Sequence, residues 1–267
     1  MGAEVLGTPL TLEQLSYFLH AQPGVVLVGG QALAFWADYY DAIGTGYESG
    51  LTRDLDFFGT RDQARIHALA LQARFPDRVT FQMATLDTPP PSTAVIFVED
   101  IDGQLEPLVI DYISAMAGYQ YETERRMLER APHVHVAGVP IRAMHPFDCL
   151  KSRIHNLALI PRKRSELGIE QARTSIRVVR AMLKDDCAAG WDRERSTALR
   201  TAEAIIELAL HRHGMEARPL YGIDVLEAIP AEAFCDRFKD TRWPQVRRYV
   251  DARFKRRYAR LPAISVR

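Results

Sequence analysis

The chain changes its pattern of apolar residues at His145-Pro146, and this change constrains its fold more than any other feature of its 267 residues. Upstream, short apolar runs alternate with segments of helical spacing, as in a domain that packs helices against a sheet. Downstream, the clear segments all have helical spacing, at 146–159, 169–184, 193–213 and 243–257. We therefore predict an α+β domain over residues 1–145, with a mixed sheet and flanking helices. An all-helical domain over residues 146–267 follows it.

Charge is divided between nearly the same two halves. Residues 1–150 hold 9 Arg, no Lys and 19 acidic residues. The whole chain has 34 residues of each sign, so 25 basic and 15 acidic residues remain for the second half. A basic domain often contacts nucleic acid. Attraction between an acidic and a basic half would explain the asymmetry equally well.

Two aspartates, Asp54 and Asp56, stand one residue apart in a predicted strand over residues 53–58. Residues i and i+2 of a strand share a face, so both carboxylates project together while Leu55 and Phe57 pack behind them. Two like charges that close are unfavourable unless one is protonated or a cation lies between them. Oxygen ligands suit Mg²⁺, or Mn²⁺ in its place. The plainer alternative is a pair that ends a strand or caps the next helix.

Two further segments belong with this pair. Gly29-Gly30 follows the apolar run 25–28 and begins a predicted helix, so a phosphate could approach its backbone closely. A glycine pair can also simply make a turn. Asp111 is the one acid in the apolar run 108–113, where burial is costly unless the acid is paired or binds a metal. If the two strands are neighbours, Asp111 completes a group of three carboxylates; otherwise it caps a strand end.

These three segments together resemble the signature of the polymerase-beta-type nucleotidyltransferase superfamily: Val28-Gly29-Gly30, then Asp54-Leu55-Asp56-Phe57, then Val109-Ile110-Asp111. Within it, the residues around Gly29 and Asp54 look most like the abortive-infection nucleotidyltransferase group, which includes toxins of type IV toxin–antitoxin pairs. The helix with Lys151 and the basic run 162–164 are similar to that group's fourth motif. The resemblance spans residues 24 to about 185 and implies a nucleotidyltransferase-fold sheet.

The resemblance also implies roles for residues. Asp54, Asp56 and Asp111 would hold the metal, with Asp111 as third ligand or base, and Lys151 would reach the triphosphate. The nucleotide would be bound by Gly29, Gly30, Gln31, Thr52, Arg53 and Lys151. From the residues alone, Lys151 could equally form a surface pair with Asp148. The chain departs from the pattern in two places: the glycine-rich loop 41–50 is long, and the acidic residue after the basic run is left between Glu170 and Gln171.

The activity expected is Mg²⁺-dependent transfer of a nucleoside monophosphate from a nucleoside triphosphate to an acceptor hydroxyl. The basic half favours RNA as acceptor, at the 3′ end of tRNA, in a toxin or phage-defence setting with a cognate antitoxin protein as partner. The alternatives are a small-molecule acceptor, as in antibiotic nucleotidylation, and a non-catalytic relative that senses nucleotides or binds a partner. The basic helix 243–257 carries Tyr249 and Phe254 among its arginines, which suits RNA or simply a solvated surface.

The compartment expected is the cytoplasm. Cys149, Cys187 and Cys235 form neither a disulfide framework nor a zinc pattern, as suits a reducing environment. The first ten residues lack the charged start and apolar block of a secretory signal. No apolar run approaches the roughly 20 residues that span a bilayer, so no membrane partner is expected.

Overall fold

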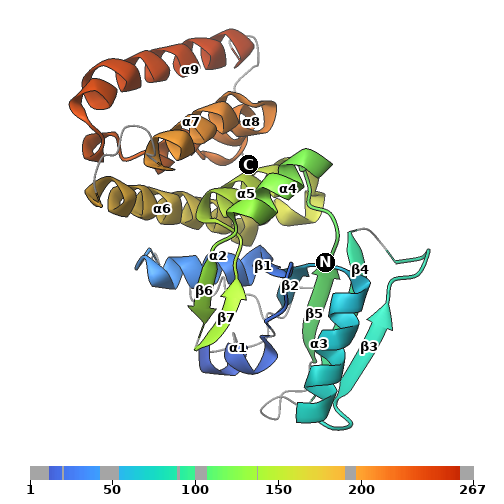
Figure 1. Ribbon diagram of the computed structural model, residues 1–267. Coiled ribbons are helices and arrows are strands. Elements are labelled where there is room, and N and C mark those ends of the chain that lie inside the picture. The colour runs from blue at the N-terminus through green and yellow to red at the C-terminus, as the bar shows by residue number, and fades with distance from the viewer. Residues whose placement is uncertain are drawn as a thin grey trace. The chain divides into compact units, whose positions relative to one another are not determined.

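The computed structural model describes residues 12–19, 21–42, 54–88, 91–99, 107–136, 138–189 and 197–258 (Figure 1). These form two compact units that divide between Ser175 and Ile176. The division falls inside the long helix α6 (Glu166–Ala188).

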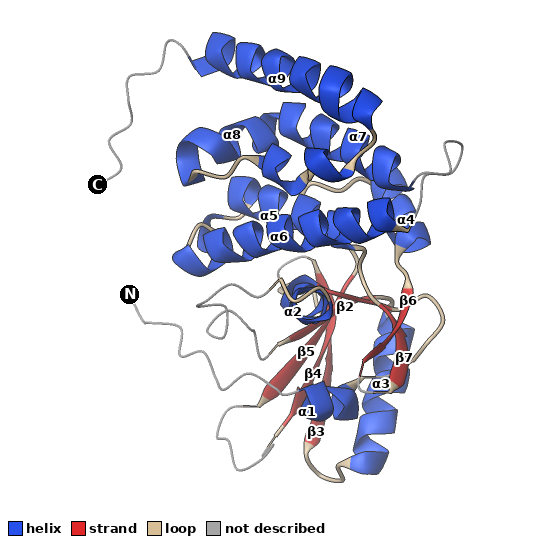
Figure 2. Ribbon diagram, turned by 90° about the vertical axis from the view of Figure 1, so that its left-hand side faces the viewer, coloured by secondary structure: helices blue, strands red, loops and turns tan. Residues whose placement is uncertain are grey.

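The first unit is built on a five-stranded mixed sheet of order β1-β2-β5-β4-β3, drawn in red in Figure 2. Its strands are β1 (Val26–Val28), β2 (Leu55–Phe58), β3 (Val79–Met83), β4 (Ser92–Val98) and β5 (Leu108–Ile113). β2 runs parallel to β5 and antiparallel to β1, and β4 is antiparallel to both β3 and β5. The predicted α+β class with a mixed sheet is confirmed.

The two faces of the sheet differ in chemistry because side chains alternate along each strand. Leu55 and Phe57 of β2 are fully buried, as are Ile110 and Tyr112, their register partners on β5. The helix α3 (Arg61–Arg74) covers this apolar face, where its His67 Nδ1 lies 2.9 Å from the Tyr112 hydroxyl. Asp56 and Asp111 belong to the opposite face. α3 begins with a capping box, in which Thr60 and Gln63 exchange side-chain hydrogen bonds with each other's backbone N–H.

Other elements complete the first unit: α1 (Leu12–Phe18), α2 (Gly29–Tyr39), α4 (Tyr121–Arg130), and the hairpin of β6 (His133–Val136) with β7 (Val139–Arg142). The sequence predicts a hairpin of residues 133–136 with 139–143, which the structure confirms, but it does not predict α4. Met127 is the one buried residue of α4, whose other positions are mostly charged. Only three of its ten residues are apolar, Tyr121, Met127 and Leu128, so the spacing of apolar residues alone does not mark it as a helix. The sequence also predicts a hairpin turn at Asp102-Gly103 and a helix N-cap at Thr11, and both lie outside the described residues.

Helix α5 (Pro146–Leu159) has the bounds predicted from sequence, yet it belongs to the first compact unit. It packs against α2, with Phe147, Leu150 and Ile154 buried. The backbone before it joins the sheet region, since Met144 N–H donates to the Leu27 carbonyl at 2.8 Å. Residue 145 therefore marks the change from strands to helices, while the compact units divide thirty residues later.

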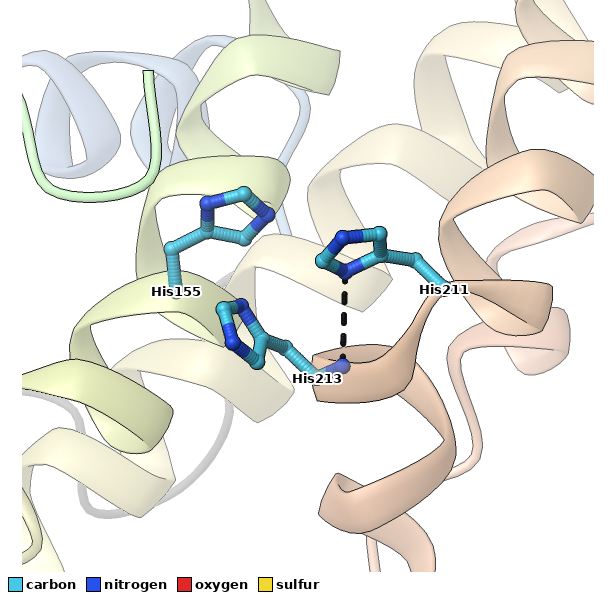
Figure 3. A group of neighbouring side chains, drawn as sticks. All are labelled: His155, His211 and His213. Atoms are coloured by element: carbon cyan, nitrogen blue, oxygen red, sulfur yellow. Dashed lines mark hydrogen bonds between the residues drawn. The ribbon is translucent and has the colours of Figure 1, made fainter. Parts of the chain in front are cut away.

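The second unit is helical. It begins with the second half of α6 and contains α7 (Thr197–Leu210), α8 (Arg212–Tyr221) and α9 (Trp243–Tyr258), joined by short 3-10 and π-helical turns at Val225–Ala228, Ala231–Ala233 and Arg237–Arg242. One helix was predicted over residues 193–213, but the chain breaks at His211. This residue is extended and caps α8: its Nδ1 accepts a hydrogen bond from the His213 N–H at 3.3 Å (Figure 3).

None of the helices in the described ranges is long and apolar enough to cross a membrane.

Candidate active site

Strand register brings Asp56 and Asp111 side by side. In the parallel pairing of β2 with β5, Asp56 is the direct partner of Asp111. Partners in adjacent strands project to the same face, so the two carboxylates point to one side of the sheet. Asp54 stands two residues before Asp56 and is exposed. The three acids together are called the carboxylate cluster below.

The first turn of α2 lies against this cluster. β1 pairs with β2 so that Val28 faces Asp56, and α2 begins at the next residue, Gly29. Gly29 has φ +69°, and a Cβ built on it would lie 1.9 Å from Asp56 Oδ2. Only glycine tolerates both the backbone conformation and this contact. The backbone amides at the start of α2 therefore lie next to the Asp56 carboxylate. The N-terminus of a helix favours a nearby anion.

Burial and mutual repulsion disfavour the ionised forms of the clustered carboxylates. Burial, followed by the nearby charge of Asp111, raises the pKa of Asp56 from 3.8 to about 6. Burial also raises the pKa of Asp111, although a 2.6 Å hydrogen bond donated by Ser92 Oγ to Asp111 Oδ1 opposes this. The negative charge of Asp54 also raises the pKa of both Asp56 and Asp111. Carboxylates with such raised pKa values are stabilised by a cation, as expected of a functional site.

The residue types at this site suit a hard divalent cation, although the ligand atoms of the three acids do not all lie within 4.8 Å of one another. Asp56 and Asp111 offer carboxylate oxygens from two adjacent strands, with a hydroxyl beside Asp111, and Asp54 adds a third carboxylate just before β2. Mg²⁺ and Mn²⁺ prefer such oxygen ligands, and Mg²⁺ is commonly bound by one or two carboxylates together with substrate phosphates.

Three basic side chains act on the cluster from α5 and the 3-10 turn Pro161–Lys163. Arg153 and Lys163 each lower the pKa of Asp56, and Arg162 lowers that of Asp111. Arg162 and Lys163 belong to the basic run singled out in the sequence. Arg153 was not assigned a role, although it shares a helical face with Cys149 and Leu150, both buried. That placement of a charge on an apolar face was the available signal.

The Lys151 side chain lies beside Tyr119 and not at the carboxylate cluster. Its ammonium lies 4.3 Å from the centroid of the Tyr119 ring, and the charges that act on it are those of Asp148, Arg130 and Arg126. Burial, its largest influence, lowers the pKa of Lys151. The surface pair with Asp148 expected as the alternative is not a surface feature, because Asp148 is fully buried and binds Arg130 Nη2 at 2.6 Å.

The other predicted site residues lie in the first turn of α2, in α6 or outside the described residues. Gly30 and Gln31 are buried in the first turn of α2. Thr52 and Arg53, and the glycine-rich loop up to Gly50, lie outside the described residues. Glu170 forms a 3.9 Å pair with Arg173 in α6, and Gln171 is buried. The fourth-motif acidic role therefore stays unassigned.

The second unit carries a separate basic surface on α8 and α9. A shallow pocket of about 450 Å³ is lined by Met215, Tyr249, Arg253, Arg256 and Arg257. This set is called the α9 pocket. Arg257 Nη2 lies 3.7 Å from Glu216 Oε1, whereas Arg253 and Arg256 make no ion pair with any described residue. Tyr249 is 52% exposed, so its ring face is available for stacking.

Comparison with known proteins adds little to this geometry. No protein-family model and no curated protein sequence matches the chain. Among solved structures, the chain is similar to an antigenic nucleotidyltransferase-like protein from Paracoccidioides brasiliensis. The TM-score is 0.39 at 16% identity, over 77% of this chain and 84% of that one. A likeness at that level says nothing about substrate, metal or partner, so the site is interpreted from its own residues.

Proposed function

We propose that this protein is a Mg²⁺-dependent nucleotidyltransferase that moves a nucleoside monophosphate from a nucleoside triphosphate to an acceptor hydroxyl and releases pyrophosphate. The observation that carries the proposal is the direct register of Asp56 with Asp111, beside Asp54 and the glycine that opens α2. This arrangement combines oxygen ligands for a cation with backbone amides for a phosphate.

In this proposal Asp54 and Asp56 hold the metal, with Asp111 as third ligand or base. A bound Mg²⁺ would neutralise phosphate charge and make the acceptor hydroxyl easier to deprotonate. Asp111, whose pKa is raised by burial, would take the acceptor proton as the acceptor oxygen bonds to the α-phosphorus. The bond from that phosphorus to the bridging oxygen breaks, and pyrophosphate leaves. Gly29 and Gly30 would orient the phosphates, since positioning and charge neutralisation supply most of the rate in phosphoryl transfer.

The proposed acceptor is RNA, at the 3′ end of tRNA, and the proposed setting is a toxin or phage-defence enzyme restrained by a cognate antitoxin protein. The α9 pocket supports an RNA acceptor because it joins an exposed aromatic ring to two guanidinium groups that have no ion pair among the described residues. Phosphate contacts and base stacking are the interactions that such side chains make with single-stranded RNA.

The test is transfer of label from each of the four α-labelled nucleoside triphosphates to total RNA, to protein and to small hydroxyl compounds. The double variant Asp54→Ala/Asp56→Ala should abolish the labelling that wild type gives. The matched control Asp87→Ala/Glu99→Ala also removes two negative charges, from exposed positions on the same unit, and should label as wild type does.

Each outcome is informative. Labelled RNA supports the full proposal, while labelled small compounds at the expense of RNA would assign the enzyme to antibiotic-type nucleotidylation. If wild type labels nothing with any nucleotide, the enzyme assignment fails and a nucleotide-sensing or partner-binding role takes its place.

A further inference from the structure

Arg153 is a buried cation without an ion-pair partner in the part of the chain that the structure describes. Its side chain is 6% exposed, in the middle of α5. Its Nε is enclosed and has no hydrogen-bond partner, and no ion pair reaches its guanidinium from any residue in the described ranges. A guanidinium is a strong hydrogen-bond donor and a fixed positive charge, so enclosing its Nε without a partner costs free energy. Such a position requires an explanation.

The surroundings of Arg153 identify where its charge acts. α5 packs on α2, whose first turn touches Asp56. The guanidinium is close enough to Asp56 to stabilise its ionised form, but burial and Asp111 outweigh that effect. Arg153 and Asp56 form no ion pair in the described part of the chain. The arginine is therefore within electrostatic reach of the cluster, where its charge would complement a bound anion.

Lys151 does not occupy this position. Two residues earlier on the same helix, it points to a different side because a helix turns 100° per residue. Its ammonium lies over Tyr119 and near the buried Asp148. Arg153 is the α5 cation that faces the cluster, together with Lys163 and Arg162 from the following turn.

We propose that Arg153 is the buried phosphate-binding residue of this site, and that its guanidinium contacts the triphosphate of the bound nucleotide. This inference rests on the proposed function for the identity of the ligand, and it assigns to Arg153 the contact that the family resemblance implies for Lys151. A guanidinium offers up to five donors in a planar fork, which suits two oxygens of one phosphate group.

The experiment measures equilibrium binding of two probes to the full chain: inorganic tripolyphosphate with excess Mg²⁺, and Mg²⁺ alone. Neither probe can be a substrate for nucleotidyl transfer, so the result does not depend on whether the chain has that activity. Arg153→Gln should weaken tripolyphosphate binding at least tenfold. It should leave the affinity for Mg²⁺ alone unchanged or increased, because a cation is removed from beside the carboxylates.

Two further variants separate binding from structural damage. Arg153→Lys should recover part of the tripolyphosphate affinity, since it keeps the charge and loses the fork. Arg142→Gln is the control: Arg142 is partly buried, and its guanidinium donates hydrogen bonds to the carbonyls of Leu128 and Ala131. That variant should lose stability and still bind tripolyphosphate.

Three results would overturn the proposal. Arg153→Gln could bind tripolyphosphate as tightly as wild type. It could lose both probes together, which would show that Arg153 only holds the site in shape. Lys151→Gln could weaken tripolyphosphate binding more than Arg153→Gln does, which would return the phosphate contact to Lys151.

Discussion

At the scale of single residues, Gly29 allows the first turn of α2 to pack against the carboxylate cluster. Gly29→Ala should destabilise the protein through both its positive φ and the contact of the new methyl group with Asp56 Oδ2. Gly138 has φ +84° and open space where a methyl group would project, so Gly138→Ala incurs only the backbone cost, about 1 kcal/mol. Urea unfolding should show a loss for Gly29→Ala that exceeds this control by more than about 1 kcal/mol. Equal losses would mean that Asp56 moves aside freely.

Asp56 gives a prediction about pH, also at the residue scale. Its pKa is 3.8 ordinarily and about 6 in the folded chain. The folded state therefore binds the proton more tightly, and the contribution to stability present below pH 3.8 is lost as pH rises through 6. In EDTA at pH 8, Asp56→Asn should be more stable than wild type by on the order of 2 kcal/mol, and the difference should disappear near pH 4.

The measurement is thermal unfolding across pH, with the exposed Asp87→Asn as control. Adding Mg²⁺ should reverse the order at pH 8, because the cation stabilises the ionised wild-type cluster and the amide variant binds it less well. A variant that is less stable than wild type at pH 8 in EDTA would show that Asp56 is not electrostatically strained.

At the scale of elements, a buried ion pair fixes α4 to α5. Arg130 contacts both oxygens of the fully buried Asp148, at 2.6 and 3.2 Å. Arg130→Met would leave that carboxylate buried without its counter-charge, and should cost about 2–4 kcal/mol at pH 7. The double variant Arg130→Met/Asp148→Leu should be more stable than Arg130→Met, because it removes the stranded charge as well. Urea unfolding of both variants provides the check, and a loss under about 0.5 kcal/mol in the single variant would contradict it.

At the scale of the whole molecule, the division of charge predicts where RNA binds and how salt affects it. Binding of a labelled single-stranded RNA should weaken steeply with salt, and Arg253→Gln/Arg256→Gln should reduce the slope of log affinity against log salt by about 1.4. Tyr249→Ala should weaken binding by about tenfold through lost stacking, with little change in that slope. Fluorescence anisotropy from low to moderate salt measures both quantities.

The control is Arg125→Gln/Arg126→Gln, which removes two exposed cations from α4 of the first unit. It should leave the slope nearly unchanged. If it lowers the slope as much as the α9 variant does, the α9 pocket has no special part in RNA binding.

The sequence by itself determined the features that depend on local periodicity. Alternation in the segment of β2 predicts that Leu55 and Phe57 are buried and that the aspartates project from the other face. Helical spacing predicts the bounds of α5. These patterns do not predict α4, which has only three apolar residues, or the break at His211, where the apolar spacing continues across a change of backbone direction.

Only the tertiary structure decided how distant residues meet. The register of β2 with β5 placed Asp111 beside Asp56, and the packing of α5 on α2 buried Arg153 while Lys151 turned to Tyr119. The physical reason is that a residue's face follows from its near neighbours in sequence. Which residue faces it across a sheet or a helix interface depends on non-local packing, and no short segment records that.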